Sequence, residues 1–462
     1  MTLISRYESY IYNDYFKTEL PKHWSEKCLG YLADHGRAAF VDGPFGSDLK
    51  SSDYIDNGVP LIQLNNIRDS KHLMQNMKFI TEEKKQQLIR HLVIPNDIVI
   101  AKMAEPVARC AIVIDEYAEY VIVADCVKLT PNLEMVDRSY LVWAINSENV
   151  KINAELVSTG TTRIRINLGE LKKLKVPYPP MSEQIKIAHF LDHKTAKIDT
   201  LIDKQQQLIE LLKEKRQAVI SHAVTKGLNP NAPMRDSGVE WLGEVPEHWE
   251  IKKLKYLVNE SLMYGANEAA LDVNFENPRF VRITDVKDDG SLKDDTFRSL
   301  NEELAKPYLL KDGDILLART GGTVGKSFMY SESWGRCCFA GYLIKASLNQ
   351  SVLKAEWFYR YTQTQYYWEW IASSQIQATL PNVSADKYNG FLIAVPPIKE
   401  QIEILNNLQT DIKRFDEIIS KAELVIQLMK ERRTALISAA VTGKIDVRDW
   451  QAPEAAEGKK AI

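Results

Sequence analysis

The chain has 462 residues, of which 45% are hydrophobic and 26% are charged, and this length allows two or three soluble domains of usual size. Its 59 lysines and arginines stand against 62 aspartates and glutamates, so the formal net charge is −3. This balance argues against a histone-like, strongly basic binder but leaves room for a local basic face.

The amino-terminal sequence lacks the apolar core of a signal peptide, and no apolar run approaches the ~20 residues of a membrane span. The five cysteines are odd in number and show no Cys-x-x-Cys spacing. This usage indicates reduced thiols rather than a disulfide framework or a zinc site. We therefore expect a cytoplasmic protein without a membrane segment.

Residues 1–178 are predicted to form a mixed domain that is rich in strands. Short β-branched runs separated by Gly, Asn, Asp or Pro are typical of strands. These runs lie at 59–64, 97–101, 111–114 and 120–124. Helical spacing of apolar residues near 137–157 adds a helical segment.

Residues 179–227 are predicted to form a long helix. Apolar residues at spacings of 3, 4 and 7 mark a stripe over about five heptads, wider than a bare coiled-coil seam. The stripe comprises Leu191, Ile198, Leu201, Ile202, Leu208, Ile209, Leu212, Val219 and Ile220. Ser182 can cap the start of this helix, and Gly227 with Pro230 can end it. Its length would be roughly 60 Å.

The chain then repeats itself. Residues 396–443 match the first helix at a constant offset of 217, with Pro-Pro, Glu-Gln-Ile and Ala-Val-Thr recurring in place. The second stripe comprises Leu408, Phe415, Ile418, Ile419, Val425, Ile426, Met429, Leu436 and Ile437. A looser upstream repeat pairs 20–24 with 245–249 and 96–102 with 313–319. The chain is therefore one half built twice.

The second half follows the same order as the first. Its short strand-like runs lie at 279–283, 314–318, 327–330 and 390–395. A helical segment at 354–372 carries the aromatic cluster of Tyr366, Tyr367, Trp368 and Trp370. We interpret this cluster as core rather than as a platform for stacking bases.

The predicted fold class is α+β, with two mixed α/β domains in tandem. Each domain is followed by a long helix, and we expect the two helices to pack as an antiparallel coiled coil with pseudo-two-fold symmetry. The expected boundaries are a first domain at 1–178, a first helix at 179–227, a linker at 228–243, a second domain at 244–395, a second helix at 396–443 and a tail at 444–462.

No catalytic or metal-binding constellation is evident in the sequence. The run from Gly321 to Lys326 is similar to a phosphate-binding loop, but only three residues separate Gly321 from Gly325 where that motif needs four. His189 and His193 have a spacing that can hold a metal, yet the repeat has Asn406 and Thr410 there. We predict neither catalysis, a metal site nor a cofactor in this chain.

Several runs resemble a known family. Both long helices open with Pro-Pro-x-x-Glu-Gln-Ile, and further matching runs lie at 42–50, 236–243 and 313–326. Two variable domains, each followed by such a helix, resemble the specificity subunit of type I restriction-modification enzymes. The resemblance covers essentially the whole chain except the tail after Trp450.

The resemblance implies a division of labour with partner subunits. Each variable domain would be a target-recognition domain that reads one half of a split, asymmetric sequence in double-stranded DNA. The helices would set the unread spacer and dock two modification subunits, which bring S-adenosylmethionine and adenine-N6 methylation. Restriction subunits would supply ATP-driven translocation and cleavage.

Two pairs of repeat-related loops are the best candidates for DNA contact. Base recognition requires Arg, Lys, Asn or Gln side chains at a groove, whereas phosphate contact requires any well-placed donor. The first pair matches 159–167 with 373–379, and the second matches the strand exits at 102–109 and 319–326. The candidates are Lys102, Arg109, Arg163, Arg165, Arg319, Thr320, Lys326, Gln375 and Gln377. Weaker candidates are Gln63, Asn65, Asn66, Arg68, Arg282 and Lys287.

The long helices supply the candidates for spacer and partner contacts. On the first helix these are Glu183, Gln184, Leu191, Ile198 and Leu208. On the second helix they are Glu400, Gln401, Leu408, Phe415 and Val425. Two alternatives stay open beside the DNA hypothesis. The chain could be a coiled-coil scaffold whose variable domains bind proteins, or an NTP-using enzyme built on residues 319–327.

Overall fold

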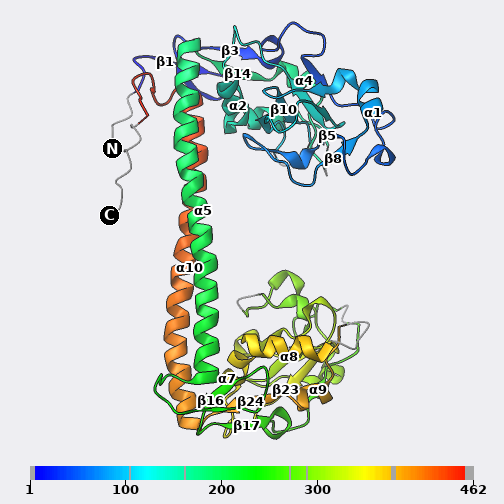
Figure 1. Cartoon of the computed structure of the whole chain (residues 1–462), viewed down its shortest axis with the longest axis vertical. Coiled ribbons are helices and arrows are strands. Elements are labelled where there is room, and N and C mark those ends of the chain that lie inside the picture. The colour runs from blue at the N-terminus through cyan, green and yellow to red at the C-terminus, as the bar shows by residue number, and fades with distance from the viewer. Residues whose placement is uncertain are drawn as a thin grey trace. The chain divides into compact units, whose positions relative to one another are not determined.

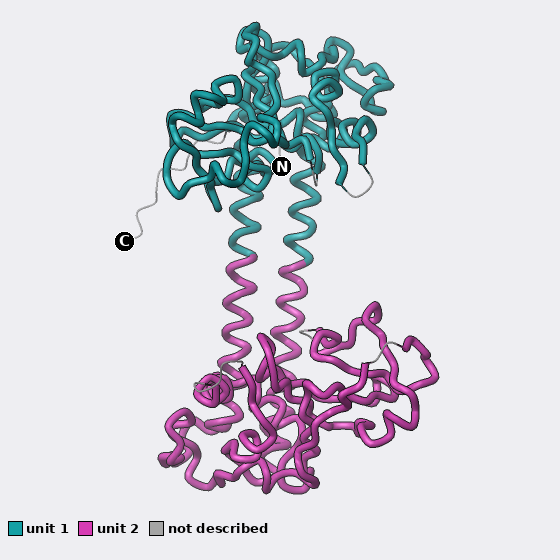
Figure 2. Tube along the Cα trace, turned by 90° about the vertical axis from the view of Figure 1, so that its right-hand side faces the viewer, with its two compact units in different colours: residues 1–205, 424–462 teal, residues 206–423 magenta. Residues whose placement is uncertain are grey.

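The computed structural model describes residues 6–103, 106–160, 163–269, 272–287, 290–375 and 381–452. It divides into two compact units, in different colours in Figure 2. Unit 1 holds residues 1–205 and 424–462, and unit 2 holds residues 206–423. Helices and strands are mixed in both units, which confirms the α+β class.

Unit 1 begins with strands and short helices (Figure 1). Its strands are β1 (Tyr10–Asn13), β2 (Thr18–Pro21), β3 (Ser25–Cys28), β4 (Phe40–Asp42), β5 (Val59–Ile62), β6 (Ile67–Arg68), β7 (Lys71–His72), β8 (Lys78–Ile80), β9 (Leu92–Val93), β10 (Ile98–Ala101), β11 (Cys110–Ile112), β12 (Tyr120–Ile122), β13 (Cys126–Leu129) and β14 (Lys175–Tyr178). Its shorter helices are α1 (Glu82–Gln87), α2 (Arg138–Asn146), α3 (Glu148–Leu156) and α4 (Leu168–Lys173).

Two four-stranded sheets organise unit 1. One has the antiparallel order β11-β10-β13-β4, and the other has the order β8-β5-β12-β9 with β5 and β12 parallel. Strand β10 is buried along its whole length, as expected of a continuous β-branched run. The Asp137 carboxylate accepts a hydrogen bond from the Tyr140 backbone N–H and caps α2.

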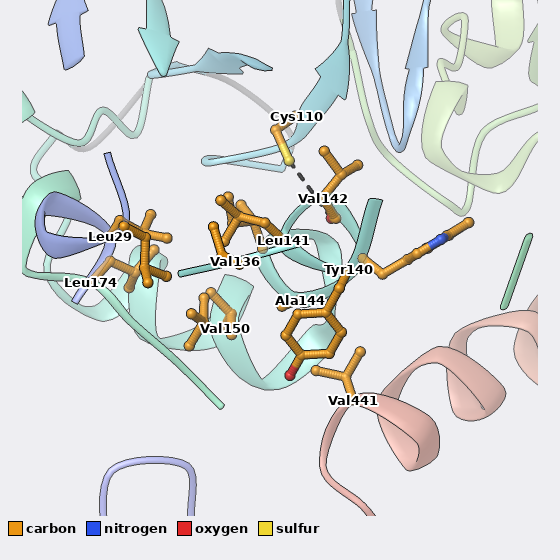
Figure 3. Close-up of a cluster of buried hydrophobic side chains, with 14 of the residues drawn as sticks. Leu29, Cys110, Val136, Tyr140, Leu141, Val142, Ala144, Val150, Leu174 and Val441 are labelled. Atoms are coloured by element: carbon orange, nitrogen blue, oxygen red, sulfur yellow. Dashed lines mark hydrogen bonds between the residues drawn. The ribbon is translucent and has the colours of Figure 1, made fainter. Parts of the chain in front are cut away.

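The main core of unit 1 includes the ends of the long helices. Tyr140 and Leu141 of α2 are fully buried, and Val441 belongs to the same cluster (Figure 3). Phe190 and Leu191 also lie in this core. Burial at this density contributes roughly 1.5–3 kcal/mol for each large apolar side chain. The long helices are therefore integral to the folded unit.

Unit 2 repeats this plan. Its strands are β15 (Met234–Asp236), β16 (Glu244–Pro246), β17 (Glu250–Lys253), β18 (Met263–Tyr264), β19 (Arg279–Val281), β20 (Ile315–Ala318), β21 (Ser327–Met329), β22 (Cys337–Phe339), β23 (Leu343–Ala346) and β24 (Leu392–Val395). Its shorter helices are α6 (Glu302–Ala305), α7 (Ala355–Tyr361), α8 (Gln365–Gln375) and α9 (Ala385–Asn389).

The central sheet of unit 2 has the order β18-β23-β20-β21, which matches the order β4-β13-β10-β11 of unit 1. Ile315 pairs with Ala346 as Ile98 pairs with Leu129, so the offset of 217 holds within the sheet. Of the aromatic cluster, Tyr367 and Trp370 are buried as predicted, whereas Trp368 is exposed.

The two long helices are α5 (Met181–Lys226) and α10 (Ile398–Val441), and each contributes one half to each unit. Asp199 on α5 pairs with Arg433 on α10 at 2.9 Å in unit 1, and Arg216 on α5 pairs with Asp416 on α10 at 3.0 Å in unit 2. The helices begin at the predicted places, but Ser182 does not cap α5. It lies within the first turn, and the Pro180 carbonyl accepts the backbone N–H of Gln184.

The buried stripe on α5 is narrower than predicted. Ile202 and Ile209 are buried, whereas the preceding residues Leu201 and Leu208 are exposed. Consecutive residues are turned by about 100° around a helix. When Ile202 and Ile209 face the partner helix, Leu201 and Leu208 therefore point away from the seam. No helix in the described ranges is both long and apolar enough to cross a membrane.

Candidate nucleic-acid interface

In both units, the two predicted loops lie against each other. The Ile166 N–H donates to the Lys102 carbonyl at 3.0 Å in unit 1, and the Val383 N–H donates to the Arg319 carbonyl at 2.9 Å in unit 2. An isolated antiparallel bridge joins Met103 to Arg165, and its equivalent joins Thr320 to Asn382. The strand exits and the loops before α4 and α9 therefore form one surface in each unit.

These hydrogen bonds correct the predicted alignment of the loops. The equivalent of Arg165 is Asn382, which retains the offset of 217, and not Gln377. Gln375 ends α8 and is half-buried, and Gln377 lies outside the described residues. Similar Arg-Ile-Arg and Gln-Ile-Gln spacing caused the error, because short polar alternations do not determine register. The offset of 217, which holds from β10 and β20 onward, identifies Asn382.

A third segment joins the same surface from β13 and β23. The Lys102 N–H donates to the Asp125 carbonyl at 2.9 Å, and the Arg319 N–H donates to the Tyr342 carbonyl at 3.0 Å. Again the two hydrogen bonds are related by the offset of 217. The strands β4 and β18 complete the frame, because Asp42 pairs with Val127 as Tyr264 pairs with Ile344.

Four equivalent side-chain positions result. The unit 1 quartet is Asp42, Lys102, Asp125 and Arg165, and the unit 2 quartet is Tyr264, Arg319, Tyr342 and Asn382. Lys102, Arg165 and Arg319 are among the residues predicted from the sequence, and the other five are not. For Asp42 and Tyr264 the reason is that β4 and β18 are related by an offset different from 217 and carry unlike residues.

The unit 1 quartet contains two ion pairs. Lys102 Nζ lies 3.0 Å from Asp42 Oδ2, and Arg165 Nη2 lies 3.0 Å from Asp125 Oδ1. The Lys102 side chain is only 5% exposed, whereas that of Arg165 is 49% exposed. Lys102 is therefore largely withdrawn from solvent and paired with an acid, while Arg165 remains accessible.

The unit 2 quartet has no acid. Arg319 lies with its Cζ 4.5 Å from the centroid of the Tyr264 ring, a cation–π contact. The Tyr264 hydroxyl accepts the Ala385 N–H at 2.9 Å, which fixes the ring. Among the described residues, Arg319 Nε and Asn382 Oδ1 are buried polar atoms without a hydrogen-bond partner. The Tyr342 side chain is exposed.

A glycine follows the first position of each quartet. A Cβ on Gly43 would lie 1.9 Å from the Val123 carbonyl oxygen, and one on Gly265 would lie 2.3 Å from the Ala340 carbonyl oxygen. Only glycine permits this close approach of two backbones. The glycine of the Asp-Gly-Pro-Phe-Gly run therefore holds the frame of the surface together.

Arg109 does not lie on this surface, contrary to the prediction. Its side chain is buried, and it donates to the carbonyl oxygens of Ile67 at 2.8 Å and Leu64 at 2.9 Å. Burial lowers the pKa of Arg109. Because these donors bind interior carbonyl oxygens of unit 1, Arg109 organises the fold there. Of the weaker candidates, Asn66 is likewise buried.

The other predicted contacts are more accessible. Lys326 and Arg163 are exposed, and Thr320 is half-buried. Gly321 and Gly322 are exposed, and a Cβ on either would meet nothing within 4 Å. The residues after this turn form strand β21 and not a helix, so the run lacks the helix that follows a phosphate-binding loop.

The Glu-Gln motif at the start of each long helix faces inward. Glu183 accepts hydrogen bonds from the Tyr7 hydroxyl at 2.9 Å and Trp24 Nε1 at 3.0 Å, and lies 2.8 Å from His23 Nε2. Burial and the bond to Glu183 raise the pKa of Tyr7. In unit 2, Glu400 accepts from Trp249 Nε1 and lies 2.8 Å from His248 Nε2.

The glutamines of the motif hold the next helix of each domain. Gln184 accepts the backbone N–H of Asp137 before α2, and Gln401 accepts that of Lys354 before α7. Both glutamines are fully buried. The motif therefore ties each helix to its own domain, and a role of these glutamines in partner contact stays a prediction. Leu191 and Leu408 are likewise buried in the cores.

The remaining helix candidates differ in exposure. Ile198, Phe415 and Val425 are half-buried, and Leu208 is exposed. Leu208 therefore lies outside the predicted seam, on the surface of unit 2.

Comparisons with known proteins give a consistent result. Residues 46–211 match the family described as type I restriction modification DNA specificity domain. The chain is 23% identical to the EcoKI specificity subunit of Escherichia coli, over 86% of this chain and 84% of that protein. It is 24% identical to the StySPI specificity subunit of Salmonella potsdam, over 88% of this chain and 87% of that protein.

A solved structure supports the fold. The chain is similar to one described under "Structural basis underlying complex assembly and conformational transition of the type I R-M system", with a TM-score of 0.68 and 15% identity. The match covers 91% of this chain and 98% of the solved chain.

Proposed function

We propose that the chain is a specificity subunit of a type I restriction-modification system, a family whose role is recognition of a DNA target, and that each unit reads one half of a bipartite target. The target is asymmetric double-stranded DNA. The two quartets are the surfaces that contact the base edges.

One observation carries this proposal: the quartets share a backbone frame but no side chain. The same backbone hydrogen bonds hold Lys102 and Arg319, yet one cation pairs with an acid and the other stacks on a tyrosine. Base recognition requires a constant frame with variable donors and acceptors, because each base pair presents its own pattern in the major groove. Since the quartets differ, the two half-sites differ.

Exposed cations beside the quartets suit phosphate contact. Arg163 lies next to the unit 1 quartet, and Lys326 lies beyond the exposed turn at Gly321 and Gly322. Phosphate contacts position a protein on the duplex without carrying sequence information. The formal charge of −3 implies that partner subunits share this neutralisation.

The long helices set the spacer and dock two modification subunits in this proposal. Each unit exposes four large apolar side chains on its segments of the long helices, and an apolar partner surface would cover them. These are Ile185, Leu201, Leu424 and Leu428 in unit 1, and Leu208, Leu211, Ile402 and Ile418 in unit 2. The modification subunits supply adenine-N6 methylation, and restriction subunits supply ATP-driven translocation and cleavage. Specificity subunits are non-catalytic members of such complexes.

Binding to DNA is tested with the chain purified together with its modification subunit. Methylation sequencing of cells that express both should give a modified adenine on each strand, flanking an undefined spacer. A labelled duplex with this target should bind more tightly than one with a scrambled half-site. The logarithm of the affinity should fall linearly with the logarithm of salt concentration. Equal binding to both duplexes would favour a scaffold that binds proteins.

Leu211→Glu tests the docking surface. Leu211 is 63% exposed on α5, and a charge placed in an apolar interface should weaken association with a modification subunit by about 2 kcal/mol or more. Gln206→Glu is the matched control, because it places the same charge about 140° away around the helix. The affinity is measured by titrating labelled modification subunit. Equal affinities for the two variants would remove Leu211 from the interface.

A further inference from the structure

We propose that Arg319 reads a guanine in the half-site bound by unit 2 and that Tyr264 positions it for this contact. The inference rests on the proposed function, since it requires that the unit 2 quartet faces DNA. It assigns a base to one side chain and a positioning role to another.

The backbone of Arg319 is held on both sides. Its N–H donates to Tyr342 and its carbonyl accepts from Val383, so the residue is fixed at the end of the buried strand β20. The guanidinium then lies over Tyr264, with Cζ 4.5 Å from the ring centroid. Tyr264 is itself fixed by the hydrogen bond from Ala385. The side chain is therefore oriented before a ligand arrives, and ordering it on binding costs less entropy.

Among the described residues, no side chain or carbonyl accepts a hydrogen bond from the Arg319 guanidinium, and its Nε is buried without a partner. At the equivalent position of unit 1, Asp42 neutralises Lys102. A planar guanidinium with paired donors matches two acceptors side by side, and guanine O6 and N7 present such a pair in the major groove.

The position favours a base over a phosphate. A phosphate contact tolerates a flexible side chain, and a lysine can also serve there as a point charge. Arg319 is instead half-buried and stacked, in a frame whose other three positions also differ between the units. Side chains that vary on a constant frame are those that distinguish bases. Asn382, whose Oδ1 also lacks a partner, stands across the bridge from Thr320 on the same surface.

The test is methylation sequencing of cells that express the full chain with its modification subunit. Arg319→Gln should lower the preference for guanine at one position of one half-site by about 5- to 150-fold. The other half-site and the spacer should stay unchanged, which also shows that the variant folds and assembles. Arg319→Lys should give an intermediate loss, because an ammonium cannot form the bidentate pair. Tyr264→Ala should lower the preference for guanine at the same position by a smaller factor than Arg319→Gln does.

Arg336→Gln is the matched control. It removes the same charge from an exposed arginine of unit 2, which pairs with Glu302, and should leave the target unchanged. An unchanged target with Arg319→Gln overturns the guanine assignment, as does a wild-type half-site without guanine. A uniform loss of methylation at all sites with the target unchanged also overturns it, because it indicates a phosphate contact. If the wild-type chain yields no bipartite target, the proposed function itself fails.

Discussion

Gly43→Ala should prevent unit 1 from folding under conditions in which Gly46→Ala folds normally. A Cβ at position 43 would lie 1.9 Å from the Val123 carbonyl oxygen and 2.2 Å from its carbon. Both blocking atoms are backbone, so no side chain can move aside, and β4 would have to separate from the chain at Val123. The expected cost exceeds about 4 kcal/mol, at the severe end for a single substitution. A Cβ on Gly46 would meet nothing within 4 Å.

The measurement is hydrogen exchange on the full chain. Protection in β10 and β13 should be lost in Gly43→Ala, while unit 2 of the same molecule serves as an internal reference. Unit 2 offers an equivalent pair of variants, for which unit 1 is the internal reference. Gly265→Ala places a Cβ 2.3 Å from the Ala340 oxygen, whereas Gly322→Ala meets nothing. Equal protection in Gly43→Ala and Gly46→Ala would contradict the close approach of the two backbones.

Glu183→Ala should destabilise unit 1 by about 2–4 kcal/mol, because it leaves buried donors without an acceptor. The carboxylate accepts from Tyr7 and Trp24 and contacts His23, and its side chain is only 9% exposed. These contacts hold the amino-terminal segment against α5. Glu183→Gln retains one acceptor oxygen and should therefore lower the stability of unit 1 by less than Glu183→Ala does.

Glu400→Ala is the paired comparison in unit 2. In the described part of the chain, the Glu400 carboxylate makes its hydrogen bonds with Trp249 and His248, and its side chain is 29% exposed. Water can replace the lost acceptor there, so the expected cost is about 1–2 kcal/mol. Hydrogen exchange resolves the two units within one chain and reports both costs. If Glu400→Ala lowered the stability of its unit by more than Glu183→Ala does, burial would not be the reason for the difference between the two sites.

The long helices follow from the sequence because apolar periodicity is a local property of the chain. The width of their seam does not. Leu201 and Leu208 have helical spacing but are exposed, since the seam between two helices admits little more than one row of side chains. The hydrogen bonds of Glu183 and Gln184 are not predictable from local sequence either, because their partners at Trp24 and Asp137 are distant in sequence.

The candidate surface was only partly predictable. Lys102 and Arg319 are predictable because equivalent strand exits have similar sequences, and Arg165 is predictable from the polar alternation of its loop. The repeat does not distinguish Arg109, whose donors bind interior carbonyls, from Arg319, whose guanidinium has no acceptor within the described ranges. It also misaligned Gln377, because short alternating runs do not define register.

The sequence by itself determines the α+β class, the repeat and the extent of both long helices, since composition, periodicity and internal similarity exist before the chain folds. Only the tertiary structure decides which cations are available. Asp42 neutralises Lys102 from 60 residues away, and Tyr264 orients Arg319 without neutralising it. Burial and ion pairing depend on contacts between distant segments, and these contacts make two similar strand exits into two different surfaces.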